Sequence, residues 1–469
     1  MAGYTRRRFL EIAGVAGGGV LLNTSLMPLA ARAQQAPAQD GLLLAVYFNG
    51  GWDQLLALDP RDHTDARFGT EAGFRASGIQ TAYNVVTDAG VQSVMSATGG
   101  RGVQARGNLT FGPAVHASLL EHAADLSIVR GMDMETLTHE VGRRYLITGK
   151  FPRGLAAAGS SLGTVVAAAN GQTKNIPHLS VACEAYNEEH EAYASPIQVS
   201  SSSAMVNVLR PAGTALSAAS TSLLNDFHSV TDCGPAPLDL QGKASLFATS
   251  RHKASQITQG GVFDLFDFSR TSNPEVASLL SAMNMSTSEI NTPKGRAALA
   301  GQALATGYAQ AVSLQIQAGL DHHFDNWRTS HAQLLRPGFE ALGNLIGFLK
   351  GKEYLGTGTS VWSRTTLLVF SEFSRTPRLN SSGGRDHHLS ASALVAGPGI
   401  RPNMVYGASS DLNQAVQFVD VATGQVKSAA DGGRKIRPAD LHHTLLTSMN
   451  LDSSHLSNQS PIVLTGLTR

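Results

Sequence analysis

The chain has 469 residues, a formal net charge of +1 at pH 7, and 15% charged residues. This near-neutral balance argues against nucleic acid or a charged membrane surface as the main partner, and favours a small-molecule ligand. The length exceeds that of one simple domain and suits a large α/β enzyme that carries insertions.

The N-terminus carries an export pattern. Its first ten residues, MAGYTRRRFL, resemble the bacterial twin-arginine consensus Ser/Thr-Arg-Arg-x-Phe-Leu. An uncharged stretch over 12–31 leads to Ala31-Arg32-Ala33, a small-x-small cleavage pattern, and is too weakly hydrophobic for a good membrane anchor. We predict a twin-arginine signal peptide over 1–33, the translocase as export partner, a leader over 34–40, and a periplasmic or secreted mature chain without a membrane span.

The sequence holds two cysteines, Cys183 and Cys233. In an oxidising compartment they would be able to form one disulfide, and two unpaired thiols are the alternative. Two cysteines are too few for a structural zinc cluster.

Short apolar runs alternate with helix-like patterns along the mature chain. The runs span 41–48, 125–131, 365–373 and 391–400, and the helical patterns span 113–124 and 332–350. This alternation predicts an α/β fold whose central, mostly parallel sheet is covered by helices on both faces. Ligands of such sheets bind beyond the carboxyl ends of the strands.

Residues 190–300 differ from the rest of the chain in composition and hydrophobic pattern, with a serine-rich run at 199–203 and no clear strand periodicity. We predict an inserted region of helices and loops there, within a domain that spans 41–469. The insertion either shapes the substrate opening or is peripheral.

The first apolar run ends at Gly50-Gly51-Trp52-Asp53. The glycines permit a sharp turn that brings the Asp53 carboxylate to the carboxyl edge of the sheet. A hard cation would suit it, although an aspartate in this position is often only a turn residue or a helix cap.

A second cluster, Thr138-His139-Glu140, follows the second run and enters a helical pattern. Unpaired N–H groups at a helix N-terminus favour an anion such as a phosphate or sulfate ester. The alternative is that Thr138 is an N-cap and nothing more.

A third cluster, Asp321-His322-His323-Phe324-Asp325, is placed at the end of a long helical stretch. In an extended segment Asp321, His323 and Asp325 point to one side, as in a mixed nitrogen and oxygen site for zinc, manganese or iron. Surface loop histidines are the alternative.

The third strand is followed by Glu372 and Arg375, and later by Arg385, Asp386 and His387. The acids and the histidine are metal-ligand types, and either arginine would be able to hold a tetrahedral anion. The pair at 442–443 lies inside an amphipathic pattern and is interpreted as helix packing. Together, these clusters at strand ends predict a metal centre.

These motifs resemble an uncharacterised bacterial family known as domain of unknown function 1501, grouped with the alkaline phosphatase and sulfatase superfamily. The resemblance covers nearly the whole mature chain and is carried by Gly50-Gly51-Trp52-Asp53, Thr138-His139-Glu140, Gly319-Leu320-Asp321-His322-His323, Ser371-Glu372-Phe373-Ser374-Arg375-Thr376-Pro377 and Gly384-Arg385-Asp386-His387. It implies an alkaline phosphatase-like fold and a metal-dependent hydrolase. Two positions depart from the superfamily pattern: His139 stands at the nucleophile position, and Phe373 stands where a histidine ligand is usual.

The resulting expectation is hydrolysis of a small anionic phosphate or sulfate ester with a divalent ion, which is zinc, manganese, iron or calcium. Its expected ligands are Asp53, Asp321, His323, Glu372, Asp386 and His387. Arg143 and Arg375 would hold the anion, water or Thr138 would attack, and His139 would act as nucleophile or as general acid and base. The alternative is a catalytically degenerate protein that binds a ligand or an envelope partner.

Overall fold

The computed structural model describes residues 41–210 and 261–469, together with 217, 219–220, 222–223, 226 and 253–254. The predicted signal peptide, the leader and Cys233 lie outside these residues, so twin-arginine export and a disulfide from Cys183, a buried residue, stay predictions. The chain divides into two compact units, Met1–Pro37 with Ser202–Ala277 and Ala38–Ser201 with Ser278–Arg469. The domain bounds that we expect from the sequence likewise stay predictions.

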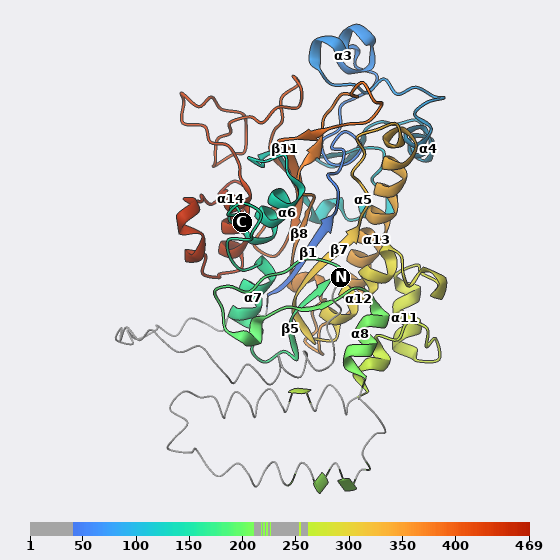
Figure 1. Ribbon diagram of the computed structural model, residues 1–469, viewed down its shortest axis with the longest axis vertical. Helices are drawn as coiled ribbons and strands as arrows, with labels where there is room; N and C mark the ends of the chain where they lie inside the picture. Colours follow the sequence, from blue (N-terminus) through green and yellow to red (C-terminus); the bar gives the residue numbers. More distant parts are fainter. Residues whose placement is uncertain are drawn as a thin grey trace. The chain divides into compact units, whose positions relative to one another are not determined.

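The larger unit is built on an eight-stranded sheet (Figure 1). Its strand order is β12-β4-β11-β8-β1-β7-β5-β6. These strands are β1 Leu42–Phe48, β4 Ser127–Asp133, β5 Ile176–Val181, β6 Ile197–Val199, β7 Ala309–Gln317, β8 Thr365–Phe370, β11 Ser390–Ala396 and β12 Met404–Gly407. Only β11 runs antiparallel to its neighbours, β4 and β8. The predicted α/β fold with a mostly parallel sheet is confirmed.

Helices cover both faces of this sheet. Leu146, Leu162 and Leu441, from α6 (His139–Thr148), α7 (Leu162–Asn170) and α14 (Pro438–Ser448), share one core cluster with residues of β1 and β8. On the other side of the sheet lie α12 (Pro293–Ala305) and α13 (Ala332–Gly351), where Gly338 approaches the ring of Phe48. The predicted helix over 332–350 is thus confirmed.

Shorter elements complete the described chain. They are the helices α2 Ala66–Gly69, α3 Glu71–Ser77, α4 Ala89–Ala97, α5 Ala117–Leu120, α8 Ser202–Leu209 and α11 Pro274–Ala282, and the strands β2 Gln104–Arg106, β3 Leu109–Phe111, β9 Ser374–Arg375 and β10 His387–His388. The strands β9 and β10 form a separate antiparallel pair. Within the described residues, none of the helices combines the length and apolar character that crossing a bilayer requires.

The prediction of a long helical stretch directly before Asp321 is wrong, because β7 occupies residues 309–317. Its sequence, AQAVSLQIQ, interrupts the apolar run with polar residues. Two of these side chains have hydrogen-bond partners inside the fold: Nε2 of Gln310 donates to the carbonyl of Gly41, and Ser313 bonds to His178 of β5. Such partners make a polar strand compatible with a buried position.

The interpretation of His442 as a packing residue is confirmed. His442 lies fully buried on α14, and its Nε2 is 2.7 Å from the carbonyl oxygen of Leu146 on α6. Burial lowers its pKa from 6.5 to about 4.

A pH-dependent stability follows from this buried ring. Because the folded-state pKa is depressed, folding favours the neutral form, so the stabilisation is present above about pH 6.5 and is lost as the pH falls toward 4. Between pH 7 and pH 5, we expect the free energy of unfolding of the wild type to fall by about 2 kcal/mol more than that of His442→Gln. Urea unfolding of both proteins at the two pH values measures this difference, and equal pH slopes would contradict it.

Candidate metal centre

Polar side chains from three segments meet at one edge of the sheet. Helix α6 begins at His139 shortly after β4, Asp321 and His323 follow β7, and His387 lies in β10, which pairs with β9 just after β8. The strands β4, β7 and β8 run in the same direction as β1, so their carboxyl ends share this edge. The site therefore lies where ligands of parallel sheets bind.

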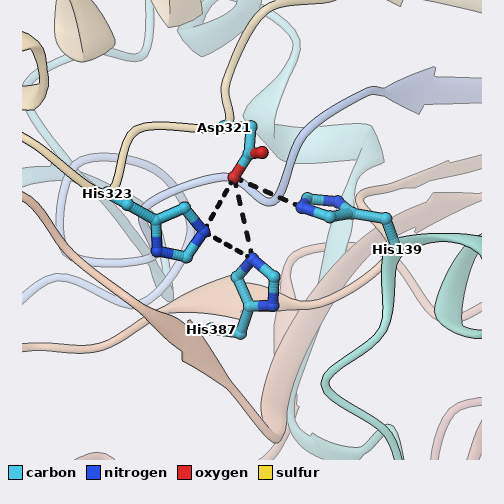
Figure 2. A group of neighbouring side chains, drawn as sticks. All are labelled: His139, Asp321, His323 and His387. Carbon is cyan, nitrogen blue, oxygen red and sulfur yellow. Dashed lines mark hydrogen bonds and ion pairs between the residues drawn. The ribbon is translucent and has the colours of Figure 1, made fainter.

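Four of these side chains converge on one point (Figure 2). The Nε2 atoms of His139, His323 and His387 lie 3.2, 3.0 and 3.6 Å from Oδ1 of Asp321, and the last two nitrogens lie 2.8 Å apart. Zinc bonds of about 2.0–2.1 Å place tetrahedral ligands roughly 3.3 Å from one another. Four of the six separations are therefore close to those of a tetrahedral metal site, and all four ligand atoms lie within 4.8 Å of one another.

The Nδ1 atom of each histidine contacts an acceptor. These acceptors are Glu372 Oε1 for His139 at 2.7 Å, Asp386 Oδ1 for His323 at 2.9 Å, and the Leu137 carbonyl for His387 at 2.5 Å. Because a neutral imidazole carries one proton, donation from Nδ1 leaves the Nε2 lone pair free to bind a metal. Histidine ligands of protein metal sites are oriented in this way.

The charges in the cluster fit a cation. Burial raises the pKa of Asp321, but the hydrogen bond and the charge of Arg375 lower it by a larger amount, to a net value of about 2. The Asp321 carboxylate is therefore ionised. For His139, the pKa-lowering effect of burial is outweighed by Glu372 and Asp321, and the net shift is upward. The buried Nε2 of His139 has no hydrogen-bond partner among the described residues. The Nε2 atoms of His323 and His387 lie 2.8 Å apart, which is a hydrogen-bond distance: either one of the two nitrogens carries a proton, or both direct their lone pairs toward a bound cation.

The apolar ring of Phe373 and the absence of a side chain at Gly51 shape the walls of the site. The Phe373 ring lies 4.7 Å from the ring of His139 and 4.3 Å from that of His387, between centroids. Gly51 has a φ of +76°, and a Cβ there would lie 2.7 Å from this phenyl ring. The side chain of Asp321 is 50% exposed, so the cluster is open to solvent on that side.

The structure does not place Asp53 in the cluster of four. Its buried carboxylate lies 3.3 Å from Nη1 of Arg385 and accepts a hydrogen bond from Nε1 of Trp327 at 3.1 Å. Burial raises the pKa of Asp53, and the charge of Arg385 opposes that shift. Asp53 thus bonds to side chains of two other segments, Arg385 and Trp327, and its role as a metal ligand stays a prediction.

Glu372 and Asp386 each contact the Nδ1 atom of a histidine of the cluster and do not lie among the four ligand atoms, and their role as direct metal ligands stays a prediction. The Glu372 carboxylate is fully buried and also accepts from the backbone N–H of Gly50 and from the Ser371 hydroxyl. Such a carboxylate fixes the orientation of the imidazole that it contacts.

The predicted catalytic residues are distributed differently. Nη2 of Arg143 donates to Glu184 at 2.7 Å, and Thr138 is the exposed N-cap of α6. Arg375 contacts Asp321 and His323, and His139 lies among the ligand atoms themselves.

Trp327 and His331 are not among the predicted site residues, and they lie four residues apart in a π-helical turn, η5 (Trp327–His331). His331 accepts from the backbone N–H of Asp53 at 3.1 Å and lies 3.0 Å from Nδ1 of His322. The spacing of the two rings on one helical face was the only signal available.

The contact between Glu372 and His139 makes a testable prediction. We expect Glu372→Gln to weaken metal binding about 10–100-fold, because the amide is a poorer acceptor for Nδ1–H and leaves the ring less basic. Zinc competition with a chromophoric chelator measures the change. An unchanged affinity would show that His139 does not contribute to binding.

Comparisons with known proteins identify no activity. A family model described as a protein of unknown function (DUF1501) matches residues 42–466. No curated protein matches the chain.

Similar solved structures include a 2-O GAG sulfatase at 10% identity and a TM-score of 0.32, covering 91% of this chain and 75% of that one. A mutant of TAB5 alkaline phosphatase with bound Mg, at 10% identity and a TM-score of 0.33, covers 88% of this chain and 100% of that one. A protein in complex with its substrate D-glucosamine-2-N,6-O-disulfate has 10% identity, a TM-score of 0.33, and coverage of 91% and 79%. These scores carry no argument about the site, whereas the family match spans nearly all of the described chain: the protein belongs to the DUF1501 family of proteins of unknown function.

Proposed function

We propose that His139, Asp321, His323 and His387 bind one divalent transition-metal ion. The observation that carries this proposal is the convergence of three Nε2 atoms and one carboxylate oxygen, with each Nδ1 contacting an acceptor. Three imidazole nitrogens and one carboxylate suit zinc, with manganese and iron as alternatives. Calcium prefers six to eight oxygen ligands, which disfavours it here.

The function that this centre supports best is hydrolysis of a phosphate or sulfate ester. A divalent ion bound there would polarise an ester oxygen and lower the pKa of a bound water. Glu372 and Asp386 orient the imidazoles, Phe373 packs against two of them and excludes water, and the half-exposed Asp321 leaves an approach for substrate. The choice of ester rests on the superfamily resemblance of the motifs.

Water is the attacking group that agrees best with the contacts. Both ring nitrogens of His139 face carboxylates, Glu372 at Nδ1 and Asp321 at Nε2, which argues against this ring as a covalent nucleophile. Thr138 precedes it on the exposed N-cap, and no contact among the described residues directs its hydroxyl to the cluster.

Metal analysis combined with hydrolysis assays tests this function. Purified protein should hold about one transition-metal ion per chain and turn over an aryl phosphate, a phosphodiester or an aryl sulfate. Chelation should abolish turnover, and zinc or manganese should restore it. Metal-free protein that gains no turnover on metal addition would contradict the proposal.

A second function, ligand binding without catalysis, is favoured by one observation. Arg143 forms an ion pair with Glu184, and Arg375 is fully buried and bonded to Asp321, so each predicted anion-holding group already has a carboxylate partner. Stoichiometric metal without turnover, together with saturable phosphate or sulfate binding, would support this function over hydrolysis.

We also propose export by the twin-arginine route, on the strength of residues 1–33. Export after folding would let the metal be acquired inside the cell. Replacing 1–33 with a general secretory signal should then give protein with wrong or absent metal. Normal metal content after this replacement would mean that residues 1–33 only target the protein for export.

A further inference from the structure

Arg375 is fully buried beside the metal centre, and every N–H group of its guanidinium has an acceptor. A guanidinium carries five N–H donors. Three of them bond to the carbonyl oxygens of Gly50, Gly51 and Arg385, and the other two bond to Asp321 Oδ1 at 2.5 Å and to His323 Nε2 at 3.2 Å. Two of the four ligand atoms of the cluster therefore accept hydrogen bonds from one arginine.

The two acceptors differ in what else they can bind. A carboxylate oxygen has two lone pairs, so Asp321 Oδ1 is able to keep Arg375 and also contact a metal. The Nε2 atom of a neutral imidazole has a single lone pair. Since His323 donates from Nδ1 to Asp386, this one lone pair is directed either to Arg375 or to a metal, and not to both.

We propose that Arg375 is a competitor of the metal, a built-in cation that binds Asp321 and His323 in the metal-free protein and sets the metal affinity of the centre. This inference rests on the proposed metal centre. Metal binding must break the bond from Nη1 to His323, and it brings a second positive charge close to a buried guanidinium. Both effects weaken metal binding relative to the same ligands without Arg375.

The test compares zinc dissociation constants of metal-free proteins by competition with a chromophoric chelator. We expect Arg375→Gln to bind zinc at least tenfold more tightly than wild type. The matched control is Arg385→Gln combined with Asp53→Asn, which removes a second fully buried arginine that bonds to Thr376 and Gln80 carbonyls but to none of the four ligand atoms. This control should bind zinc no more tightly than wild type.

If folded Arg375→Gln binds zinc as tightly as wild type or more weakly, Arg375 does not compete with the metal. That result would not contradict the metal centre itself. Absence of zinc binding by wild type and both variants would overturn the metal centre itself, and this inference with it.

A measurement on the wild-type protein decides the question if Arg375→Gln does not fold. In the ¹⁵N spectrum of metal-free, histidine-labelled protein, His323 should be the Nδ1–H tautomer with Nε2 accepting a hydrogen bond, and Arg375 should retain slowly exchanging guanidinium protons. Zinc should shift Nε2 and speed the exchange of an Arg375 proton. A protonated Nε2 in the metal-free state, or guanidinium exchange that zinc leaves unchanged, would overturn the proposal.

Discussion

Replacing His323 with alanine should reduce zinc affinity by about two to three orders of magnitude. Four-ligand zinc sites bind with roughly 10–16 kcal/mol, so an equal share for one of the four ligands is about 2.5–4 kcal/mol. His323 also contacts Oδ1 of Asp321 and Nε2 of His387, so its loss removes a central member of the cluster. Metal content after dialysis and zinc competition both measure this effect.

The control for this variant is His443→Ala. His443 lies on α14, outside the cluster, and its Nδ1 contacts the hydroxyl of Ser453 at 2.7 Å. Its replacement should leave the zinc affinity unchanged. Equal losses in the two variants would mean that metal binds through scattered surface histidines rather than through the centre in Figure 2.

Replacing Asp53 with alanine should lower the free energy of unfolding of the metal-free protein by about 3–5 kcal/mol. Arg385 is fully buried, and Asp53 is its only carboxylate partner among the described ion pairs. Removing the carboxylate leaves a guanidinium charge in the interior without its counter-charge, and it leaves Trp327 Nε1 without an acceptor. Urea unfolding of metal-free protein measures this loss independently of metal binding.

Two further variants serve as comparisons for Asp53→Ala. Asp53→Ala combined with Arg385→Met should recover part of the stability. Replacing both members of a buried ion pair by apolar side chains costs less than removing one member and leaving the other charge unpaired. Asp62→Ala removes an exposed carboxylate that bonds Thr64 and lies 3.8 Å from Nδ1 of His63, and it should change stability by less than about 0.5 kcal/mol. Unchanged stability with lost metal binding in Asp53→Ala would instead support Asp53 as a ligand.

The strands that the sequence predicts best are those with uninterrupted apolar runs. All residues of β1 and β8 are buried, and their sequences LLLAVYF and TTLLVF contain no charged group, so the residue pattern alone indicates central strands. Strand β7 is also largely buried, but its polar residues keep the sequence from indicating a central strand. The partners that make this burial possible, such as His178 for Ser313, lie on other strands. Local pattern does not contain these distant partners.

The sequence by itself determined the α/β class and the residue types at the strand ends, because burial and periodicity are local properties of the chain. Asp321, His323 and His387 were predicted as ligands on this basis, and they do share one cluster. Only the tertiary structure decided which acids face that cluster: Asp53 pairs with Arg385, and Glu372 holds His139. The physical reason is that a buried carboxylate must find a cation or a donor, and Arg385 and His139 come from segments hundreds of residues away along the chain from the acids that they contact.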